Sequence, residues 1–236
     1  MTATSQRRDE AHAPGHASRW GSVLRLAVYF VLLVAAFAGL GLLIVHVLSH
    51  GIVGADDRSV ERTLAHHRTP TLNSFTAVTT WLAETPTIVV LTAALALTAR
   101  LVWKRWRDAL FVVVAVAGET SAFVLVTLLV HRPRPPVHHL DAAPPTSSFP
   151  SGHTAASVAF YGAAAVLCSP RVRAVALRVL LWLLAIAVPV AVAVSRMYRG
   201  MHFPTDVASG AMLGLLWLTA TTLVFRPNGV RDTASR

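Results

Sequence analysis

The chain has 236 residues, of which 54% are hydrophobic and 14% are charged, and its mean hydropathy is +0.57. A soluble domain of this length could not bury so much apolar surface in one core, so the composition excludes an ordinary soluble protein and predicts an integral membrane protein. The net charge of +10 would suggest a nucleic-acid partner for a soluble protein, but in a membrane protein we attribute it to basic cytoplasmic loops and expect no nucleic acid.

Six apolar stretches are each long enough to form a helix across the bilayer core, which takes about 20 residues. The first of them contains a short sequence that resembles a signal-peptidase site, but the apolar run continues past it, so we interpret it as an uncleaved anchor. The predicted fold class is all-α, a polytopic membrane protein with six transmembrane helices. The predicted spans are Val23–Leu48, Thr85–Val102, Ala109–Val130, Ser151–Cys168, Val179–Val194 and Asp206–Phe225.

The long connection Gly51–Glu84 separates the first two spans and carries two short amphipathic patterns, Arg58–His66 and Leu72–Trp81. We expect both to form short surface helices on or near the outer side of the membrane. Two interpretations remain open for this connection, a cap over a functional site and a simple spacer.

Three polar clusters lie where later spans meet loops. Cluster one, His131–Pro136, ends the third span; cluster two, Pro150–His153, opens the fourth; cluster three, Ser195–Asp206, joins the fifth and sixth. In any six-span arrangement these positions fall on the same side of the membrane, so we expect the three clusters to meet. A convergence of arginine and histidine at a membrane boundary indicates a site that handles phosphate.

The distribution of basic residues predicts the orientation. The two tails and the loops near Arg105 and Arg173 together carry 14 Lys and Arg, and the opposite side carries 7. The richer side should be cytoplasmic, which places both termini inside, the clusters outside and the protein in the cell membrane. The predicted organisation is a disordered cytoplasmic tail over 1–22, a six-helix membrane domain over 23–226 and a cytoplasmic tail over 227–236.

Cluster two is the start of a helix. Pro150 and Ser151 are helix-start residues, so the amides of Ser151, Gly152 and His153 should be free at a helix N-terminus, where anions bind. Gly152 would let a phosphate oxygen approach the backbone, and the Ser151 hydroxyl is a further donor. A purely structural cap would have the same Pro-Ser-Gly sequence; the neighbouring His153 favours a function.

Cluster three holds a histidine and an aspartate four residues apart. Asp206 can accept a hydrogen bond from one nitrogen of His202, which would fix the tautomer and leave the other nitrogen free to act as a nucleophile. Arg196 supplies a planar guanidinium suited to phosphate oxygens.

Cluster one ends its helix abruptly with three prolines and leaves Arg132 and Arg134 at the membrane boundary. Juxtamembrane arginines commonly contact lipid phosphates without any further role, so this cluster gains meaning only beside the other two. For the following loop, with His138, His139 and Asp141, we expect a solvated segment rather than a metal site.

These clusters resemble the signature of the type 2 phosphatidic acid phosphatase superfamily, which consists of Lys-x6-Arg-Pro, Pro-Ser-Gly-His and Ser-Arg-x5-His-x3-Asp. The second motif matches in full at Pro150–His153, and the third matches in full over Ser195–Asp206. The first matches at Arg134-Pro135 but has Thr127 where the family has lysine. The similarity covers about residues 23–226.

The resemblance implies a role for each matching residue. His202 would be the nucleophile that forms a phosphohistidine, Asp206 its orienting partner, and His153 the acid that protonates the leaving oxygen and then activates water. The phosphoryl oxygens would be held by Arg134, Arg196, Ser151 and the Gly152 amide. Members of this family require no metal or other cofactor, and we expect none here.

Two positions in the third span depart from expectation. Thr127 replaces the family lysine, and the chain's only lysine, Lys104, lies in a predicted cytoplasmic loop. Arg132 is therefore a candidate to fill the vacancy and bind substrate. Glu119 is an acid within an apolar span, which we interpret as structural packing ahead of catalysis.

The predicted function is a metal-independent membrane phosphatase that cleaves a lipid phosphomonoester or diphosphate. Candidate substrates are phosphatidate, phosphatidylglycerol phosphate and polyprenyl diphosphate carriers. The alternatives are a lipid phosphotransferase and a non-catalytic transporter of anionic lipid or phosphate; only a catalyst needs the oriented imidazole.

Overall fold

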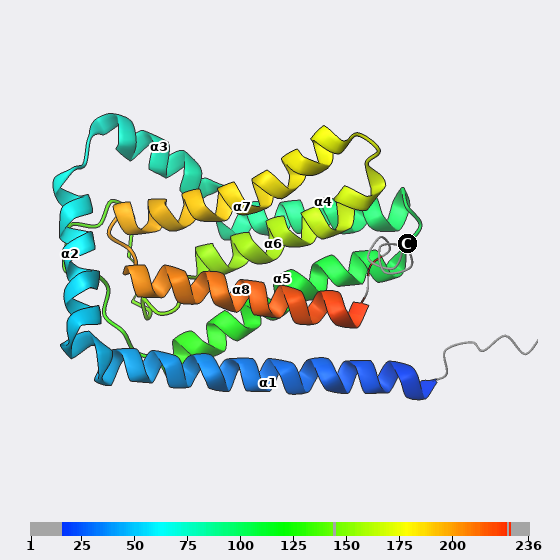
Figure 1. Cartoon of the computed structure of the whole chain (residues 1–236), viewed down its shortest axis with the longest axis horizontal. Helices are drawn as coiled ribbons and strands as arrows, with labels where there is room; N and C mark the ends of the chain where they lie inside the picture. The colour runs from blue at the N-terminus through cyan, green and yellow to red at the C-terminus, as the bar shows by residue number, and fades with distance from the viewer. Residues whose placement is uncertain (1–15, 144, 226, 228–236) are drawn as a thin grey trace, which may run out of the picture.

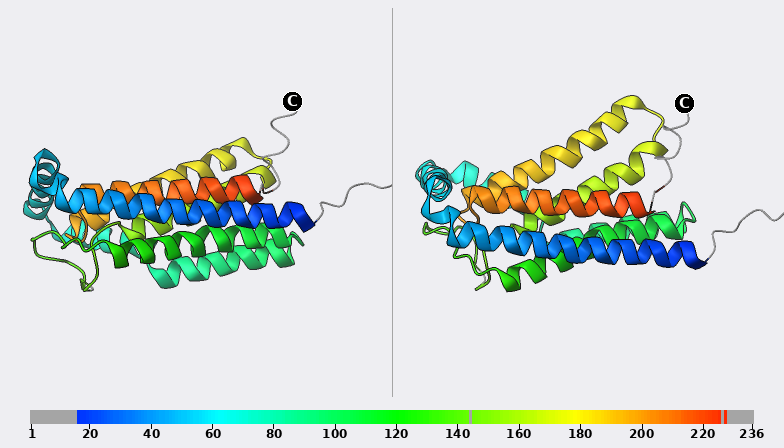
Figure 2. Two further views of the ribbon diagram at one scale, coloured as in Figure 1. Left: turned by 90° about the horizontal axis from the view of Figure 1, so that it is seen from below. Right: turned by 60° about the horizontal axis from the view of Figure 1, so that its bottom comes forward.

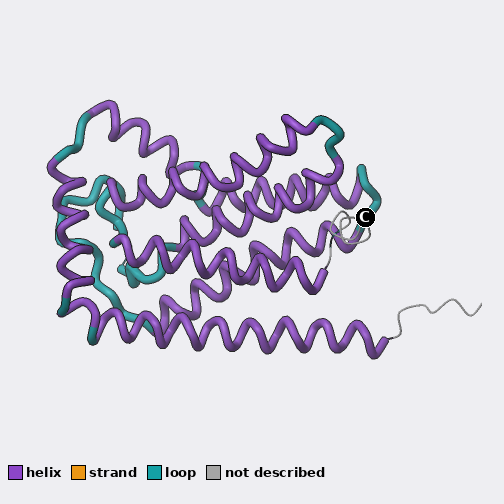
Figure 3. Tube along the Cα trace, in the orientation of Figure 1, coloured by secondary structure: helices purple, strands orange, loops and turns teal. Residues whose placement is uncertain are grey.

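The computed structural model describes residues 16–143, 145–225 and 227, and every regular element in this part of the chain is helical (Figure 3). The elements are α1 (His16–His46), η1 (Leu48–His50), α2 (Ile52–His66), α3 (Pro70–Trp81), α4 (Thr85–Leu101), α5 (Trp106–Leu129), α6 (Gly152–Cys168), η2 (Ser169–Arg171), α7 (Val175–Tyr198) and α8 (Pro204–Phe225).

Each of the six predicted spans and both amphipathic patterns is a helix, so the all-α prediction is confirmed. The largest difference lies at the start, where α1 begins at His16, seven residues before the predicted boundary at Val23. Residues 16–22 therefore continue the first helix, although they were expected to belong to a disordered tail. The remaining parts of the predicted tails, 1–15 and 228–236, lie outside the described residues.

The long helices form one elongated bundle in which α5 and α6 are central (Figure 1). One core cluster joins α1, α5 and α8, and includes Phe37, Val126 and Trp217. A second cluster joins α4, α5, α6 and α8 toward the other end of the bundle, around Phe111 and Leu167. The core thus fixes the relative positions of α5, α6 and α8, and members of all three polar clusters lie at or beside the ends of these helices.

Helices α6 and α8 approach each other closely because α8 lacks side chains at two facing positions. A Cβ atom at Gly210 would lie 2.4 Å from the Ser151 carbonyl oxygen, and one at Gly214 would lie 2.5 Å from that of Ala155. Small residues four apart are the usual means by which membrane helices pack backbone to backbone. This contact brings the start of α6 beside the start of α8.

The connection between α1 and α4 covers one end of the bundle. Helix α2 crosses that end, and α3 packs on α7 (Figures 1 and 2). Asp57 of α2 is 2% exposed and bonds to the first turn of α8. The cavity that holds His202 is lined by no residue of α2 or α3, so both interpretations left open by the sequence, a cap over the site and a spacer, stay predictions.

Helix α7 contains Pro189 and leans away from the bundle over its first half (Figure 2). Proline removes a hydrogen bond and bends a helix at this kind of position. Large apolar side chains remain exposed along α7, among them Trp182, Leu183 and Ile186. An apolar face of this kind has no partner in the fold and suits contact with lipid.

Within residues 16–143, 145–225 and 227, four helical segments are long and apolar enough to cross a membrane, and they correspond to α1, α5, α7 and α8. The bent pair formed by α3 and α4, with 42° between its parts, would make a fifth. Helices α4 and α6 have 17 residues each, at the lower limit of what a bilayer core requires. The sequence-based count of six spans therefore stays a prediction.

Candidate active site

The three polar clusters meet at the end of the bundle that α2 crosses, as the sequence predicts. A cavity of about 520 Å³ opens there between α4, α5, α6 and the end of α7. Five residues of the three clusters line this cavity: Arg134, Gly152, His153, Arg196 and His202. The fold thus brings one or more members of each cluster to a single site.

The end of α7 is a tight turn that positions His202. Gly200 has φ +78°, a backbone conformation in which a side chain is strained. Its amide donates to Met197 O at 2.8 Å, and the amide of Met201 donates to Arg196 O at 3.0 Å, which are the two bonds of a Schellman motif. The turn reverses the chain at once, so His202 lies beside Arg196 of the helix that precedes it.

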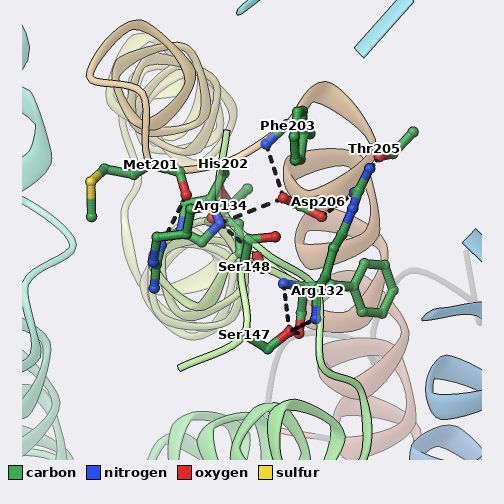
Figure 4. Close-up of polar contacts among 12 residues, drawn as sticks. Arg132, Arg134, Ser147, Ser148, Met201, His202, Phe203, Thr205 and Asp206 are labelled. Carbon is green, nitrogen blue, oxygen red and sulfur yellow. Dashed lines mark hydrogen bonds and ion pairs between the residues drawn. The ribbon is translucent and has the colours of Figure 1, made fainter. Parts of the chain in front are cut away.

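His202 is 4% exposed and is held by a backbone carbonyl (Figure 4). Its Nδ1 lies 2.7 Å from Ser148 O. Because a carbonyl oxygen only accepts, Nδ1 carries the proton and Nε2 keeps a free lone pair. Burial, together with the charges of Arg196 and Arg134, lowers the pKa of His202 well below its usual value of 6.5 and so favours the neutral, nucleophilic form.

Asp206 does not orient His202 as predicted. Its Oδ2 lies 3.9 Å from His202 Nδ1, beyond hydrogen-bond distance, and instead accepts from the Phe203 amide at 2.9 Å. Its Oδ1 accepts from Arg132. The expectation was wrong in this detail because Asp206 lies in the first turn of α8, where the free backbone amides compete for its carboxylate. The orienting group is Ser148 O, and Asp206 supports the loop around it.

Arg132, which was expected to help bind the substrate, does not line the cavity that contains His202. Its Nη2 pairs with Asp57 at 2.7 Å, its Nη1 contacts both Asp206 and, at 2.7 Å, Thr205, and its guanidinium stacks on the ring of Phe203. It lines a separate cavity of about 480 Å³ on the α1 and α2 side. Two buried carboxylates on different helices hold Arg132 away from the cavity that contains His202.

Arg134 and Arg196 both keep free donors at the cavity. Arg134 donates from Nη1 to Met201 O at 2.8 Å, and Arg196 donates from Nη1 to Asp141 at 2.9 Å. In each residue Nε is buried without a hydrogen-bond partner among the described residues. A buried guanidinium with an open donor is prepared to bind an anion.

The loop after cluster one is partly exposed, as at His138 and Ala142, but its Asp141 is half-buried and paired. Asp141 accepts from Arg196 and Arg199, and Arg199 also donates to Asn73 O of α3 at 3.1 Å. Although burial opposes ionisation, the hydrogen bond from Arg199 and the charges of both arginines lower the pKa of Asp141. Asp141 is therefore an anionic partner that fixes Arg196 at the cavity wall.

The start of α6 only partly matches expectation. Ser151 does not face the cavity: its amide donates to Asp206 O at 3.0 Å and its hydroxyl bonds Thr154 Oγ1 at 2.9 Å. The close packing of α6 on α8 turns the Ser151 side chain toward the interior of the bundle, away from the position that the predicted contact with phosphoryl oxygens requires. Gly152 and His153 do line the cavity, and amides in the first turn of a helix have no intrahelical acceptor. His153 Nε2 lies 3.4 Å from Glu84 Oε1 at the start of α4.

The two unusual residues of α5 have different positions. Thr127 is half-buried, its hydroxyl has no hydrogen-bond partner among the described residues, and it does not line the cavity. Glu119 does line the cavity and is 1% exposed. The interpretation of Glu119 as packing alone therefore leaves out its position on the cavity wall.

Sequence reasoning missed Asp57, Glu84, Asp141 and the carbonyl of Ser148. Asp57 shows a weak signal, since an acid interrupts the apolar face of an amphipathic helix. Glu84 and Asp141 lie in or beside loops and acquire partners only through the packing of distant segments. A backbone carbonyl has no sequence signal.

The sequence profile of the PAP2 superfamily, the type 2 phosphatidic acid phosphatases, matches residues 108–229, more than half of the chain. An undecaprenyl-diphosphatase of Sulfolobus acidocaldarius is 33% identical over 119 residues, which are 50% of this chain and 53% of that protein. The chain thus aligns with about half the length of this relative.

The fold is similar to the crystal structure described as the first transmembrane PAP2 type phosphatidylglycerolphosphate phosphatase from Bacillus subtilis. The TM-score is 0.66 and the sequence identity is 24%, over 90% of this chain and 96% of that one.

Proposed function

The chain belongs to the PAP2 superfamily, and on this premise we propose that it is a membrane phosphatase that hydrolyses a lipid phosphomonoester or diphosphate. One observation carries the proposal above all others. His202, whose Nδ1 donates to Ser148 O, lines the same cavity as two arginines whose Nε donors have no partner among the residues that the structure describes. A free imidazole nitrogen among cations suits attack on phosphorus.

The proposed reaction has two steps. His202 Nε2 attacks phosphorus while the bond from phosphorus to the lipid oxygen breaks, and His153 gives that oxygen its proton. His153 then removes a proton from water, whose oxygen attacks phosphorus and releases inorganic phosphate and neutral His202. Glu84, 3.4 Å from His153, stabilises its protonated state between turnovers.

The phosphoryl oxygens are held by Arg134, Arg196 and the free amides of Gly152 and His153. These groups are fixed before the substrate binds: Arg196 by Asp141, and the amides by the first turn of α6. Donors held in place stabilise developing charge without reorganisation. No metal takes part in the proposed reaction.

We propose that α1, α4, α5, α6, α7 and α8 all cross the cell membrane. The start of α1 and the end of α8 lie at one end of the bundle, and α2 lies at the other (Figure 1). The cavity is lined by the starts of α4 and α6 and by the end of α7, which lie toward the end that α2 crosses. The side with 14 of the 21 Lys and Arg is taken as cytoplasmic, which places both termini inside and the cavity at the outer side. Helices α2 and α3 then lie near the outer surface.

The substrate tail enters from the lipid between α4 and α5. Val89 and Thr120, on these two helices, line the cavity and are both exposed on the outside of the bundle. A chain that passes between them remains in hydrocarbon while its phosphate reaches the polar end of the cavity. We expect no nucleic-acid partner and no cofactor.

The test is phosphate release from lipid phosphates by the purified protein in detergent, with EDTA present. Wild type should release phosphate, and His202→Ala and His153→Ala should each lower turnover by at least about a hundredfold. Arg178→Ala, remote from the cavity at the start of α7, is the matched control. Equal turnover in wild type and both histidine variants would reject the proposed catalysis, and lipid binding without phosphate release would favour a transporter.

A further inference from the structure

The deep half of the cavity holds one acid among apolar side chains. Its walls there are Ile88 and Val89 of α4, Val116 and Phe123 of α5 and Ala156 of α6. Glu119 projects from α5 within this region and is 1% exposed. An acid inside an apolar span is costly and usually has a partner.

The protein does not supply that partner in full. Glu119 Oε2 accepts a long hydrogen bond, 3.4 Å, from the Thr120 hydroxyl. Oε1 is buried and has no hydrogen-bond partner among the described residues. Burying a polar group without a partner destabilises the folded protein, so a ligand that bonds Oε1 would remove this cost.

The depth of Glu119 matches a particular part of a lipid. Phe123 packs at the start of α6, since a Cβ on Gly152 would lie 2.7 Å from its ring. Glu119 is four residues earlier on α5, about 6 Å deeper along the helix axis. When the phosphate lies at the first turn of α6, the group beside Glu119 is therefore only a few bonds from phosphorus.

The two candidate lipid classes differ in that position. A glycerolipid phosphate carries hydroxyl or ester groups there, whereas a polyprenyl phosphate carries hydrocarbon. A carboxyl group accepts from a hydroxyl and, when neutral, donates to an ester carbonyl. We propose that Glu119, beside the Thr120 hydroxyl, recognises the polar linkage of a glycerolipid phosphate and selects it over a polyprenyl phosphate. This inference rests on the proposed function, because it names the substrate class of the same cavity.

The experiment compares phosphate release from phosphatidate and from undecaprenyl phosphate. Glu119→Leu should lower kcat/KM for phosphatidate about tenfold and leave that for undecaprenyl phosphate unchanged or higher. Glu119→Gln, which keeps polar atoms at the same place, should retain most of the preference. Ser121→Ala is the matched control, because its hydroxyl bonds Ala117 O on the exposed side of α5. Equal losses for the two lipids, or no loss, would overturn the inference.

A binding arm separates this inference from the proposed catalysis. In His202→Ala protein, phosphatidate should raise Tm more than undecaprenyl phosphate does, and adding Glu119→Leu should abolish the difference. If the wild type releases phosphate from neither lipid, the proposed catalysis fails. The comparison of Tm shifts then tests by itself whether Glu119 recognises the glycerolipid. Equal Tm shifts with and without Glu119 would then reject its role in recognition.

Discussion

Two groups of charged side chains lie close together at the covered end of the bundle, and they differ in whether their hydrogen bonds are complete. In the first, Asp57, Arg132, Thr205 and Asp206 satisfy one another and tie α2 to α8. In the second, Arg134, Arg196 and Glu119 line the cavity, and each keeps a buried polar atom that has no partner within the described part of the chain. Complete pairing indicates a structural role and open atoms indicate a place for a ligand, although both groups look alike in the sequence.

The largest expected contrast is between the two arginines of cluster one. Arg132→Met leaves Asp57 and Asp206 buried and unpaired, so we expect a loss of about 3–5 kcal/mol in stability. Arg134→Met removes a cavity donor and should lower turnover about a hundredfold, while its stability changes by about 1 kcal/mol. Thermal unfolding in detergent and phosphate release, measured on both variants, test this separation. Similar losses of stability in the two variants would contradict it.

Glu61 is a buried acid outside both cavities, and it tests how a charged group without a partner affects stability. It lies one turn after Asp57, is 1% exposed, lines neither cavity and has no hydrogen-bond partner for either carboxyl oxygen among the described residues. Burial raises its pKa to about 8; Arg68 opposes this shift, and Asp206 and Asp57 add to it. The Glu61 carboxyl thus has no partner in the part of the chain that the structure describes and lines neither cavity, so its burial should lower the stability of the folded protein, with no effect on ligand binding.

The sign of the effect follows from linkage. An acid whose pKa is raised by folding binds its proton more tightly in the folded protein, so stability falls as the pH rises from about 4.5 to about 8. Glu61→Gln stays neutral and should therefore raise Tm at pH 8.5 and change it little at pH 4.5. Thermal unfolding across this range measures the difference, and Asp56→Asn, at an exposed acid of the same helix α2, is the control. A Tm gain that does not depend on pH would refute the assignment.

The smallest expected effect concerns the missing lysine. Thr127 lies one turn beyond Phe123 on α5, and its hydroxyl is unpaired. Thr127→Lys would extend a cation toward the phosphate end of the cavity and should tighten phosphate binding several-fold, worth about 1 kcal/mol. Inhibition of the wild type and the variant by inorganic phosphate measures this. Thr127→Val, which adds no charge, is the control, and an inhibition constant that is the same in all three proteins would exclude the effect.

The helices were predictable because their signals are local. An apolar run such as Thr85–Val102 must bury or face lipid along its whole length, and its observed helix ends one residue earlier, at Leu101. Pro204 and Gly200 likewise mark a start and a turn through their own backbone restrictions. The N-terminal boundary was wrong because polar residues such as Arg19 can extend a helix once the apolar part has formed.

The sequence predicted which residues form the site better than it predicted their hydrogen bonds and ion pairs. The sequence alone determined that His153, Arg134, Arg196 and His202 belong to one polar site at one end of a helical bundle, since each lies at a helix end fixed by apolar segments. Only the tertiary structure decided that Ser148 O holds His202, that Arg132 pairs with Asp57, and that Ser151 faces α8. The physical reason is the distance along the sequence between the interacting residues. Helix ends are determined by neighbouring residues, whereas an ion pair forms with whichever partner the folded chain brings within a few ångströms.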